Sequence, residues 1–415
     1  MNGYRGDIIN YKKIEIKLFV LFLFAQNLAL IKTKNFGIAA LTVYLIFLFM
    51  KYKMYESFKI KNMIFSILFG VLVIISLIFG SNINLLSLLR WLMLGFILIT
   101  SLKYMKVIYS ENKEYEFWNI FFNISIIILI YGLYEYIANI LRLPLFLNIF
   151  SNNPSYAEIG IYNYVGGWTD FHRIYTMFYE PSAYAVFLVG VLVLLFNNKY
   201  IYKKKKIFII ILILINEMLT FSRSGWGILI YTFSGYFLLI SLYKFNFFKY
   251  FSNFINKIIL FIPFYNLFFM YIANRYIFND LSSKARTNSA IYYLIKSLKS
   301  IKSILFGYGI GAIDNTYSNE LWVMNYIEQQ AHNGYIEFIY EFGWVLFFIV
   351  LIYFYLSTKK IRRYKDRVIV LLFTSSISSF GIMYSVESVL VLVVMVYSYN
   401  KLENLKFMKK NYTDL

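Results

Sequence analysis

Long apolar runs, separated by short basic segments, recur along the whole chain. Several approach the roughly 20 residues that a helix needs to cross the hydrocarbon core of a membrane. They predict twelve candidate spans, near residues 14–31, 36–50, 63–80, 83–100, 117–140, 182–196, 207–221, 225–242, 258–272, 343–356, 368–385 and 386–399. Of the 415 residues, 60% are hydrophobic and 15% are charged, whereas average soluble domains are about 45–50% apolar. We therefore expect an all-α polytopic membrane protein, with residues 1–415 as a single integral membrane domain.

The lysines and arginines predict the orientation of these spans. Three strongly basic segments, 51–61, 198–206 and 357–367, fall on one side if the N-terminus is cytoplasmic. Cytoplasmic loops of membrane proteins carry such an excess. Both termini are then expected in the cytoplasm, and the first apolar run is interpreted as a retained helix. The same bias accounts for most of the net charge of +20, so nucleic acid is not an expected partner. The chain has no cysteine, which excludes disulfides and thiolate metal sites.

Two long segments are expected on the outer side, at residues 142–180 and 273–342. Within the second, residues 283–306 place apolar side chains at 291, 294, 295, 298, 301 and 305, which draws one face of a helix. Lys296 and Lys299 lie elsewhere on the same helical wheel. This spacing predicts an amphipathic helix at the membrane interface.

Charged residues inside apolar spans are costly and are candidates for function. Arg90, Glu135 and Glu217 lie within spans, and Arg223 and Glu387 lie at span ends. In the predicted orientation all five lie in the outer half of the membrane or at its outer edge. A transporter is expected to place such charges near the midplane, so the pattern favours a site at the outer face. The alternative is that some of these side chains only reach to the interface.

The 273–342 segment is divided into a basic half and an acidic half. Up to residue 303 it carries one acid, Asp280, and six cations: Arg275, Lys284, Arg286, Lys296, Lys299 and Lys302. From 304 to 342 it has no Lys or Arg but has His332 and five acids: Asp314, Glu320, Glu328, Glu337 and Glu341. Cations can hold an anionic leaving group while a histidine or carboxylate accepts a proton from a hydroxyl nucleophile. Alternatively, the lysines bind anionic headgroups of membrane lipids and the acids are solvated.

Three shorter motifs accompany this segment. Pro181, in "YEPSA", suits the first turn of a helix, where the preceding Glu180 is favoured by its charge. "SRSG" at 222–225 sets Arg223 in a tight turn between two spans. "FGYGIG" at 306–311 follows no strand, so we interpret it as a turn and not as a nucleotide site. His172, the other histidine, is interpreted as a surface residue.

Together these pieces resemble the O-antigen polymerase and O-antigen ligase superfamily of bacterial membrane glycosyltransferases. The resemblance covers most of the chain in layout and is carried by four motifs in order: "R-x6-EPS" from Arg173 to Ser182, "SRSG", "AR" at Arg286 followed by "LFGYGIG", and "HNGYIEFIYEFG" from His332 to Gly343. The chain departs from the family at one point: its nearest aromatic residues after Arg286 are Tyr292 and Tyr293, where a tryptophan is frequent.

The resemblance implies transfer of a glycan from polyprenyl diphosphate at the outer face of a bacterial cytoplasmic membrane, with no cofactor and no metal. It implies that Arg223 and Arg286 clamp the diphosphate and that His332 orients or deprotonates the acceptor hydroxyl. Arg173 and Glu180 match the polymerase-like part of the pattern, with Glu180 as an alternative base. The expected site is completed by Asn333, as a substrate-binding residue, and by four supporting charges: Glu337, Glu341, Glu217 and Arg90.

These features leave three functions open. The "EPS" motif favours a polymerase that joins oligosaccharide repeat units into O-antigen, capsule or exopolysaccharide, with a chain-length regulator as a candidate partner. A ligase would instead move finished glycan from polyprenyl diphosphate to another acceptor. A flippase for lipid-linked glycan would share the helix count and the basic cytoplasmic face, but it is expected to line a central cavity with charge.

Overall fold

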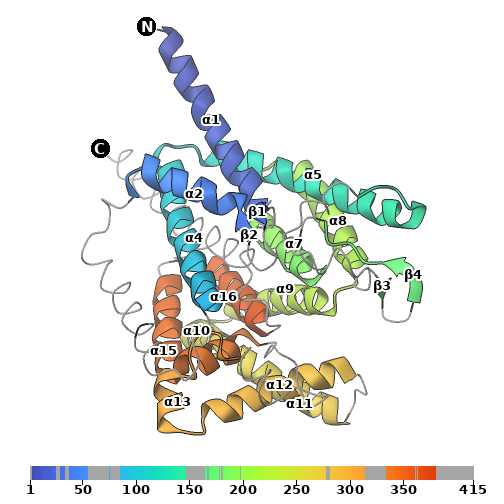
Figure 1. Cartoon of the computed structure of the whole chain (residues 1–415), viewed down its shortest axis with the longest axis vertical. Helices are drawn as coiled ribbons and strands as arrows, with labels where there is room; N and C mark the ends of the chain where they lie inside the picture. The colour runs from blue at the N-terminus through green and yellow to red at the C-terminus, as the bar shows by residue number, and fades with distance from the viewer. Residues whose placement is uncertain are drawn as a thin grey trace. The chain divides into compact units, whose positions relative to one another are not determined.

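The computed structural model describes residues 2–24, 29–32, 37–54, 74, 85–145, 164–165, 168–176, 178, 181–196, 198–276, 281–313, 333–359, 361 and 363–379. These residues are mainly helical (Figure 1). The chain divides into two compact units. Unit 1 comprises Met1–Met54, Ile97–Leu229 and Ser385–Tyr397, and unit 2 comprises Tyr55–Phe96, Ile230–Tyr384 and Ser398–Leu415.

Unit 1 is built from helices and two short antiparallel ladders. Its helices are α1 (Asn2–Phe24), α2 (Ala40–Lys51), the second part of α4 (Leu85–Ser110), α5 (Glu114–Leu141), α7 (Pro181–Phe196), α8 (Lys203–Thr220) and the start of α9 (Arg223–Tyr243). Its ladders pair β1 (Ala29–Lys32) with β2 (Gly37–Ala39) and β3 (Tyr164–Val165) with β4 (Trp168–His172). In register, Lys32 faces Gly37 and Tyr164 faces His172. These ladders are a small departure from the expected all-α fold.

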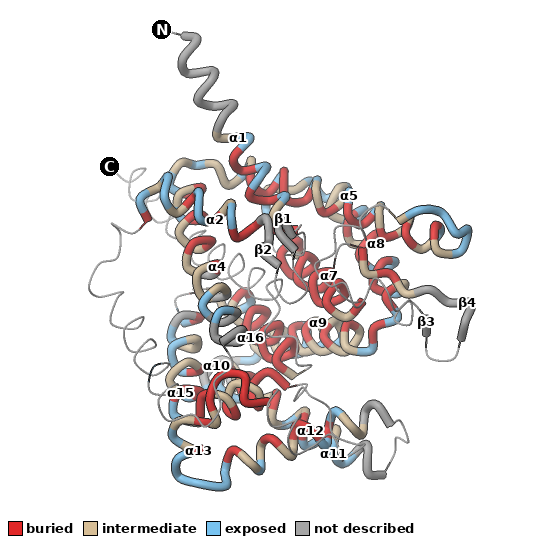
Figure 2. The backbone as a smooth tube through the Cα atoms, viewed as in Figure 1, coloured by how far each residue is buried: buried red, intermediate tan, exposed pale blue. Residues whose placement is uncertain are grey.

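Helix α7 is buried along almost its whole length, as the tube of Figure 2 shows. Its sequence is apolar on every side, which is typical of a helix surrounded by others. It packs on α8, and α8 packs on α5. Near their starts, Lys205 of α8 donates to the side-chain oxygens of Asn119 and Asn123 of α5 at 3.2 and 2.7 Å. Asn216 of α8 donates to Leu129 O of α5 at 3.1 Å, so the two helices run in the same direction.

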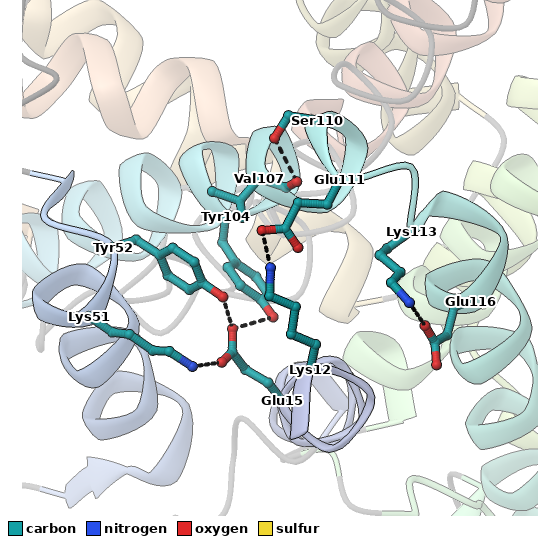
Figure 3. A network of polar contacts seen from close by, with 10 residues as sticks. All are labelled: Lys12, Glu15, Lys51, Tyr52, Tyr104, Val107, Ser110, Glu111, Lys113 and Glu116. Carbon is teal, nitrogen blue, oxygen red and sulfur yellow. Dashed lines mark hydrogen bonds and ion pairs between the residues drawn. The ribbon is translucent and has the colours of Figure 1, made fainter. Parts of the chain in front are cut away.

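A second group of polar contacts ties α1, α2 and α4 together (Figure 3). The carboxylate of Glu15, 4% exposed, accepts hydrogen bonds from Lys51, Tyr52 and Tyr104, the last at 3.1 Å. Burial and then the Glu15 carboxylate raise the pKa of Tyr52, so its hydroxyl stays a donor. Because every donor in the group faces an acceptor, these polar groups can be buried at low cost.

The described part of unit 2 contains the first part of α4 and the remainder of α9. It also contains α10 (Asn246–Leu260), α11 (Ile262–Tyr276), α12 (Leu281–Ser297), α13 (Ile301–Phe306), α15 (Gly334–Lys359) and α16 (Tyr364–Ser379). Helix α15 packs on α12, α13 and α16. The aromatic centre of this packing is Tyr340, whose ring lies 4.9 Å from Tyr293 and 4.7 Å from Tyr308 between centroids.

Three helices in the described residues are long and apolar enough to cross a membrane: Glu114–Leu141, Arg223–Tyr243 and Gly334–Leu356. The bent pair Phe254–Leu260 and Ile262–Ile272 makes a fourth if it is counted as one broken span. These helices indicate a membrane protein, while the twelve spans stay a prediction. Of the twelve, residues 386–399 lie outside the described part of the chain, as do residues 63–80 apart from Ile74.

Two expected elements differ in the structure. The span expected at 258–272 is interrupted at Phe261, where α10 and α11 meet with a bend of 55°. Pro263 in the first turn of α11 has no N–H to continue the α10 ladder. The helix expected at 283–306 is broken after Ser297, and Ser300 and Ser303 form a capping box that starts α13. Of its expected apolar face, Ile295, Leu298, Ile301 and Leu305 are exposed.

Candidate functional site

The turn between α8 and α9 sets Arg223 at the start of a helix. Phe221 adopts a left-handed conformation that ends α8. Ser222 then caps α9, since its Oγ accepts the N–H of Gly225 at 3.1 Å and its carbonyl accepts that of Trp226. Serine is among the preferred residues for this position. The expected tight turn at "SRSG" is therefore confirmed, and Arg223 is the exposed first residue of α9.

Arg173 reaches the same turn from a distant part of the sequence. Its Nε donates to Thr220 O, the last residue of α8, at 3.0 Å. The neighbouring Ile174 N–H donates to Leu219 O at 3.2 Å. The segment that follows β4 thus lies along the end of α8. Two of the expected arginines, 50 positions apart in the sequence, are brought to one turn of the molecule.

Two buried carboxylates lie in the same unit. Glu135 of α5 is 0% exposed and accepts the backbone N–H of Thr176 at 2.6 Å and that of Tyr175 at 3.4 Å. Glu217, in the last turn of α8, is also 0% exposed. Within the described ranges, neither of its side-chain oxygens has a hydrogen-bond partner. It rests against the first turn of α9, because a Cβ added at Gly225 would collide with its Oε1.

Tyr184 of α7 lies near both carboxylates. Its hydroxyl donates to Asn216 Oδ1 at 2.9 Å, and the Asn216 amide donates in turn to Leu129 O and Leu212 O. The hydroxyl also lies close to Gly132, where an added Cβ would be 3.1 Å away. Helices α5, α7 and α8 thus meet through satisfied hydrogen bonds of Asn216, the residue directly before Glu217. Such a network holds the carboxylates and the α8–α9 turn in a fixed geometry.

Unit 2 holds the expected residues of the second outer segment. Asn333 caps α15: its Oδ1 accepts the N–H of Tyr335 at 3.1 Å and of Ile336 at 3.3 Å, while its amide donates to Pro263 O at 3.1 Å. Glu341 accepts the N–H of Gly311 at 3.0 Å. Both side chains therefore hold backbone in place, which their motif did not indicate.

The glycines of "FGYGIG" dock on a kink in α15. Gly307, Gly309 and Gly311 have positive φ, so the expected turn is confirmed. Gly343 interrupts α15 with φ 83° and ψ 167°. The N–H groups of Tyr308 and Gly309 donate to the backbone oxygens of residues 340 and 341 at 2.8 and 3.1 Å. The backbones of the "FGYGIG" segment and of α15 approach so closely that neither Gly307 nor Gly343 has room for a Cβ.

The described residues of the expected site are therefore divided between the two units. Arg173, Glu217 and Arg223 lie together in unit 1, and Arg286, Asn333, Glu337 and Glu341 lie in unit 2, with Arg286 exposed on α12. Arg90 lies on α4, but its side chain falls outside the described part. His332 and Glu180 lie outside the described residues. Pro181 begins α7 as expected.

Several residues of the unit 1 group were not expected from the sequence. The sequence places Glu135 within a span but does not indicate that it belongs to this group, and no motif points to Asn216, Tyr184, Thr220 or Ser222. One sequence signal for this group is "NE" at 216–217, because two polar residues in succession are unusual within an apolar span.

The arrangement suits an anion held by arginines beside a helix N-terminus. Guanidinium groups match phosphate oxygens, and the first turn of a helix favours negative charge. Within the described ranges, no group of three or more His, Cys, Asp or Glu could hold a metal ion. No family model matches this chain, and neither a curated protein nor a solved structure matches it.

Proposed function

We propose that this chain is a membrane glycosyltransferase that polymerises oligosaccharide repeat units carried on polyprenyl diphosphate. The proposed location is the outer face of a bacterial cytoplasmic membrane, with both termini in the cytoplasm. The donor is a glycan on polyprenyl diphosphate, and the acceptor is a hydroxyl group of a second glycan.

The meeting of Arg173 and Arg223 at the end of α8 supports this proposal most directly. A lipid-linked diphosphate carries its negative charge at the membrane surface, so its receptor needs cations at a helix end and not in a span centre. Helix α8 carries four lysines, 203–206, at its other end. Of its 18 residues, the 14 that follow the lysines correspond to about 21 Å, which crosses the roughly 30 Å of a hydrocarbon core where the bilayer is thinned. The arginines and the lysines would then lie at opposite surfaces.

The proposed reaction uses the residues in three roles. Arg223 and Arg173 of unit 1 hold the diphosphate and stabilise its charge as it leaves, while for Arg286 of unit 2 the same role stays a prediction of its motif. The acceptor hydroxyl attacks the anomeric carbon while the bond from that carbon to the diphosphate oxygen breaks. The hydroxyl proton passes to His332, with Glu180 as the alternative base, and polyprenyl diphosphate departs. Glu341 and Asn333 hold the loop and helix that flank residues 314–332.

The first experiment compares lipid-linked and surface glycan from cells with and without this protein. Single repeat units retained on lipid in the deletion strain support the polymerase. Long polymer on lipid, absent from its final acceptor, would indicate a ligase instead. Repeat units trapped on the cytoplasmic side would indicate a flippase and refute the catalytic roles.

The two histidines provide a matched pair of variants. His332→Ala is expected to abolish polymer formation by the purified protein in nanodiscs, because the proton acceptor is lost. His172→Ala removes the other histidine and is expected to leave the product ladder unchanged. Full activity of His332→Ala, with inserted and folded protein, would refute its role.

A further inference from the structure

The proposed reaction uses none of the three buried glutamates of unit 1, Glu15, Glu135 and Glu217, and Glu217 differs from the other two in its hydrogen bonding. Its neighbour Glu135 has both carboxylate oxygens bonded to backbone N–H groups. Glu217 is equally buried, yet both its oxygens lack hydrogen-bond partners among the residues the structure describes. An unpaired buried carboxylate is costly, so its retention at this position calls for a role.

The surroundings of this carboxyl group indicate what the role is. Oε1 of Glu217 lies against Gly225 in the first turn of α9. A Cβ added at Gly225 would collide with this oxygen and also with Ala185 Cβ of α7. The carboxyl group is thus enclosed between α7 and the N-terminus of α9. Its contact there, Gly225, is two positions after Arg223 in the sequence. The N-terminal end of a helix carries partial positive charge that attracts a carboxylate.

Hydrogen bonds order the same turn, starting from the backbone carbonyl of Glu217 and not from its carboxylate. Thr220 Oγ1 donates to Glu217 O at 2.8 Å and accepts the N–H of Ser222 at 3.2 Å. Ser222 Oγ then accepts the N–H of Gly225. Arg173 is fixed to Thr220 O from the other side. Arg173 is therefore fixed to the last turn of α8, where Glu217 lies, and Arg223 begins α9 directly after Phe221 and Ser222, which follow that helix.

We propose that Glu217 is a positioning residue that sets the first turn of α9, and with it Arg223, for binding the diphosphate of the lipid substrate. This inference rests on the proposed function, since it assigns Arg223 to the diphosphate. Glu217 itself does not touch the substrate. It acts through the placement of α9, so its removal weakens binding only while Arg223 is present.

A double-mutant cycle tests this dependence. Purified protein in detergent micelles is titrated with farnesyl diphosphate, and Kd is compared for wild type, Glu217→Gln, Arg223→Ala and the double variant. We expect Glu217→Gln to raise Kd about tenfold, or about 1.4 kcal/mol. Arg223→Ala should raise Kd by a larger factor, on the order of 30-fold, and the double variant should bind no more weakly than Arg223→Ala.

The control is Glu116→Gln, which makes the same carboxylate-to-amide change in the same unit, at a residue paired with Lys113, and should leave Kd unchanged. Additive effects of the two site variants, or an unchanged Kd in Glu217→Gln, would overturn the positioning role. Equal binding by wild type and Arg223→Ala would instead refute the proposed diphosphate site. If Glu217→Gln does not fold, Glu217→Asp takes its place in the cycle, because the shorter side chain withdraws the carboxyl from Gly225. The same changes in Kd are then expected, and the same outcomes would overturn the positioning role.

Discussion

Replacing Gly343 by alanine should strongly destabilise unit 2. Gly343 has φ 83° and ψ 167°, a region essentially restricted to glycine, where another residue costs on the order of 1–3 kcal/mol. The added methyl group would lie 2.6 Å from Leu305 O and 2.8 Å from Gly307 N. Because both are backbone atoms, the "FGYGIG" segment must move away. That movement breaks two backbone hydrogen bonds to residues 340 and 341, each worth about 1 kcal/mol net.

The expected loss is therefore about 3–5 kcal/mol of unfolding free energy. It can be measured by denaturant unfolding in mixed micelles. Gly95→Ala is the matched control in the same unit: an added Cβ meets nothing within 4 Å there. Alanine in a helix interior is favoured over glycine by about 1 kcal/mol, so this variant should be neutral or more stable. A Gly343→Ala variant as stable as the Gly95→Ala control would refute the close backbone approach and the need for positive φ.

Three further predictions concern other parts of the chain. Asn333→Ala should cost about 1 kcal/mol through loss of the α15 cap, whereas Asn333→Asp should retain the cap; lost transfer activity in a stable Asn333→Asp protein would indicate substrate contact instead. Glu15→Ala should cost about 2–3 kcal/mol, because it removes the acceptor of Lys51 and two tyrosine hydroxyls at about 1 kcal/mol each, as measured by thermal unfolding. Burial raises the pKa of Tyr200 from 10.0 to about 12, so its stabilising contribution is complete below pH 10 and is lost as pH rises towards 12. Tyr200→Phe should therefore flatten the stability profile over that window, while Tyr202→Phe, at an exposed tyrosine, should not.

Local features of the fold could be predicted from the sequence, and long-range pairings could not. Pro181 at the start of α7, and the turn at "SRSG", depend on the conformational preferences of a few adjacent residues. The interruption at Phe261 was also within reach, since Pro263 lies inside the expected span and signals a break. The pairing of Glu135 with Thr176 joins residues 41 positions apart. It depends on how α5 meets the segment after β4, which no local pattern specifies.

The helix expected at residues 283–306 is present as two helices, α12 and α13, and its position at the membrane interface stays a prediction. Its apolar positions were assigned to the membrane side, and Ile295, Leu298 and Ile301 are indeed exposed. The helix nevertheless buries a second face, through Ala290 and Tyr293, whose small and aromatic side chains do not stand out in a hydropathy pattern. The break after Ser297 follows from the Ser300 and Ser303 capping box, a signal readable in the sequence but overlooked beside the stronger apolar spacing.

Electrostatics explain why the α8–α9 turn is more than a connection. A cation at a helix N-terminus is opposed by the partial positive charge of the helix, and Arg223 occupies that place on α9. Arg173, fixed at the same turn, adds a second cation. The buried Glu217 carboxyl lies beside Gly225 in the first turn of α9. An anion binding from outside would relieve the repulsion, and a diphosphate offers oxygens to both arginines and to the helix end.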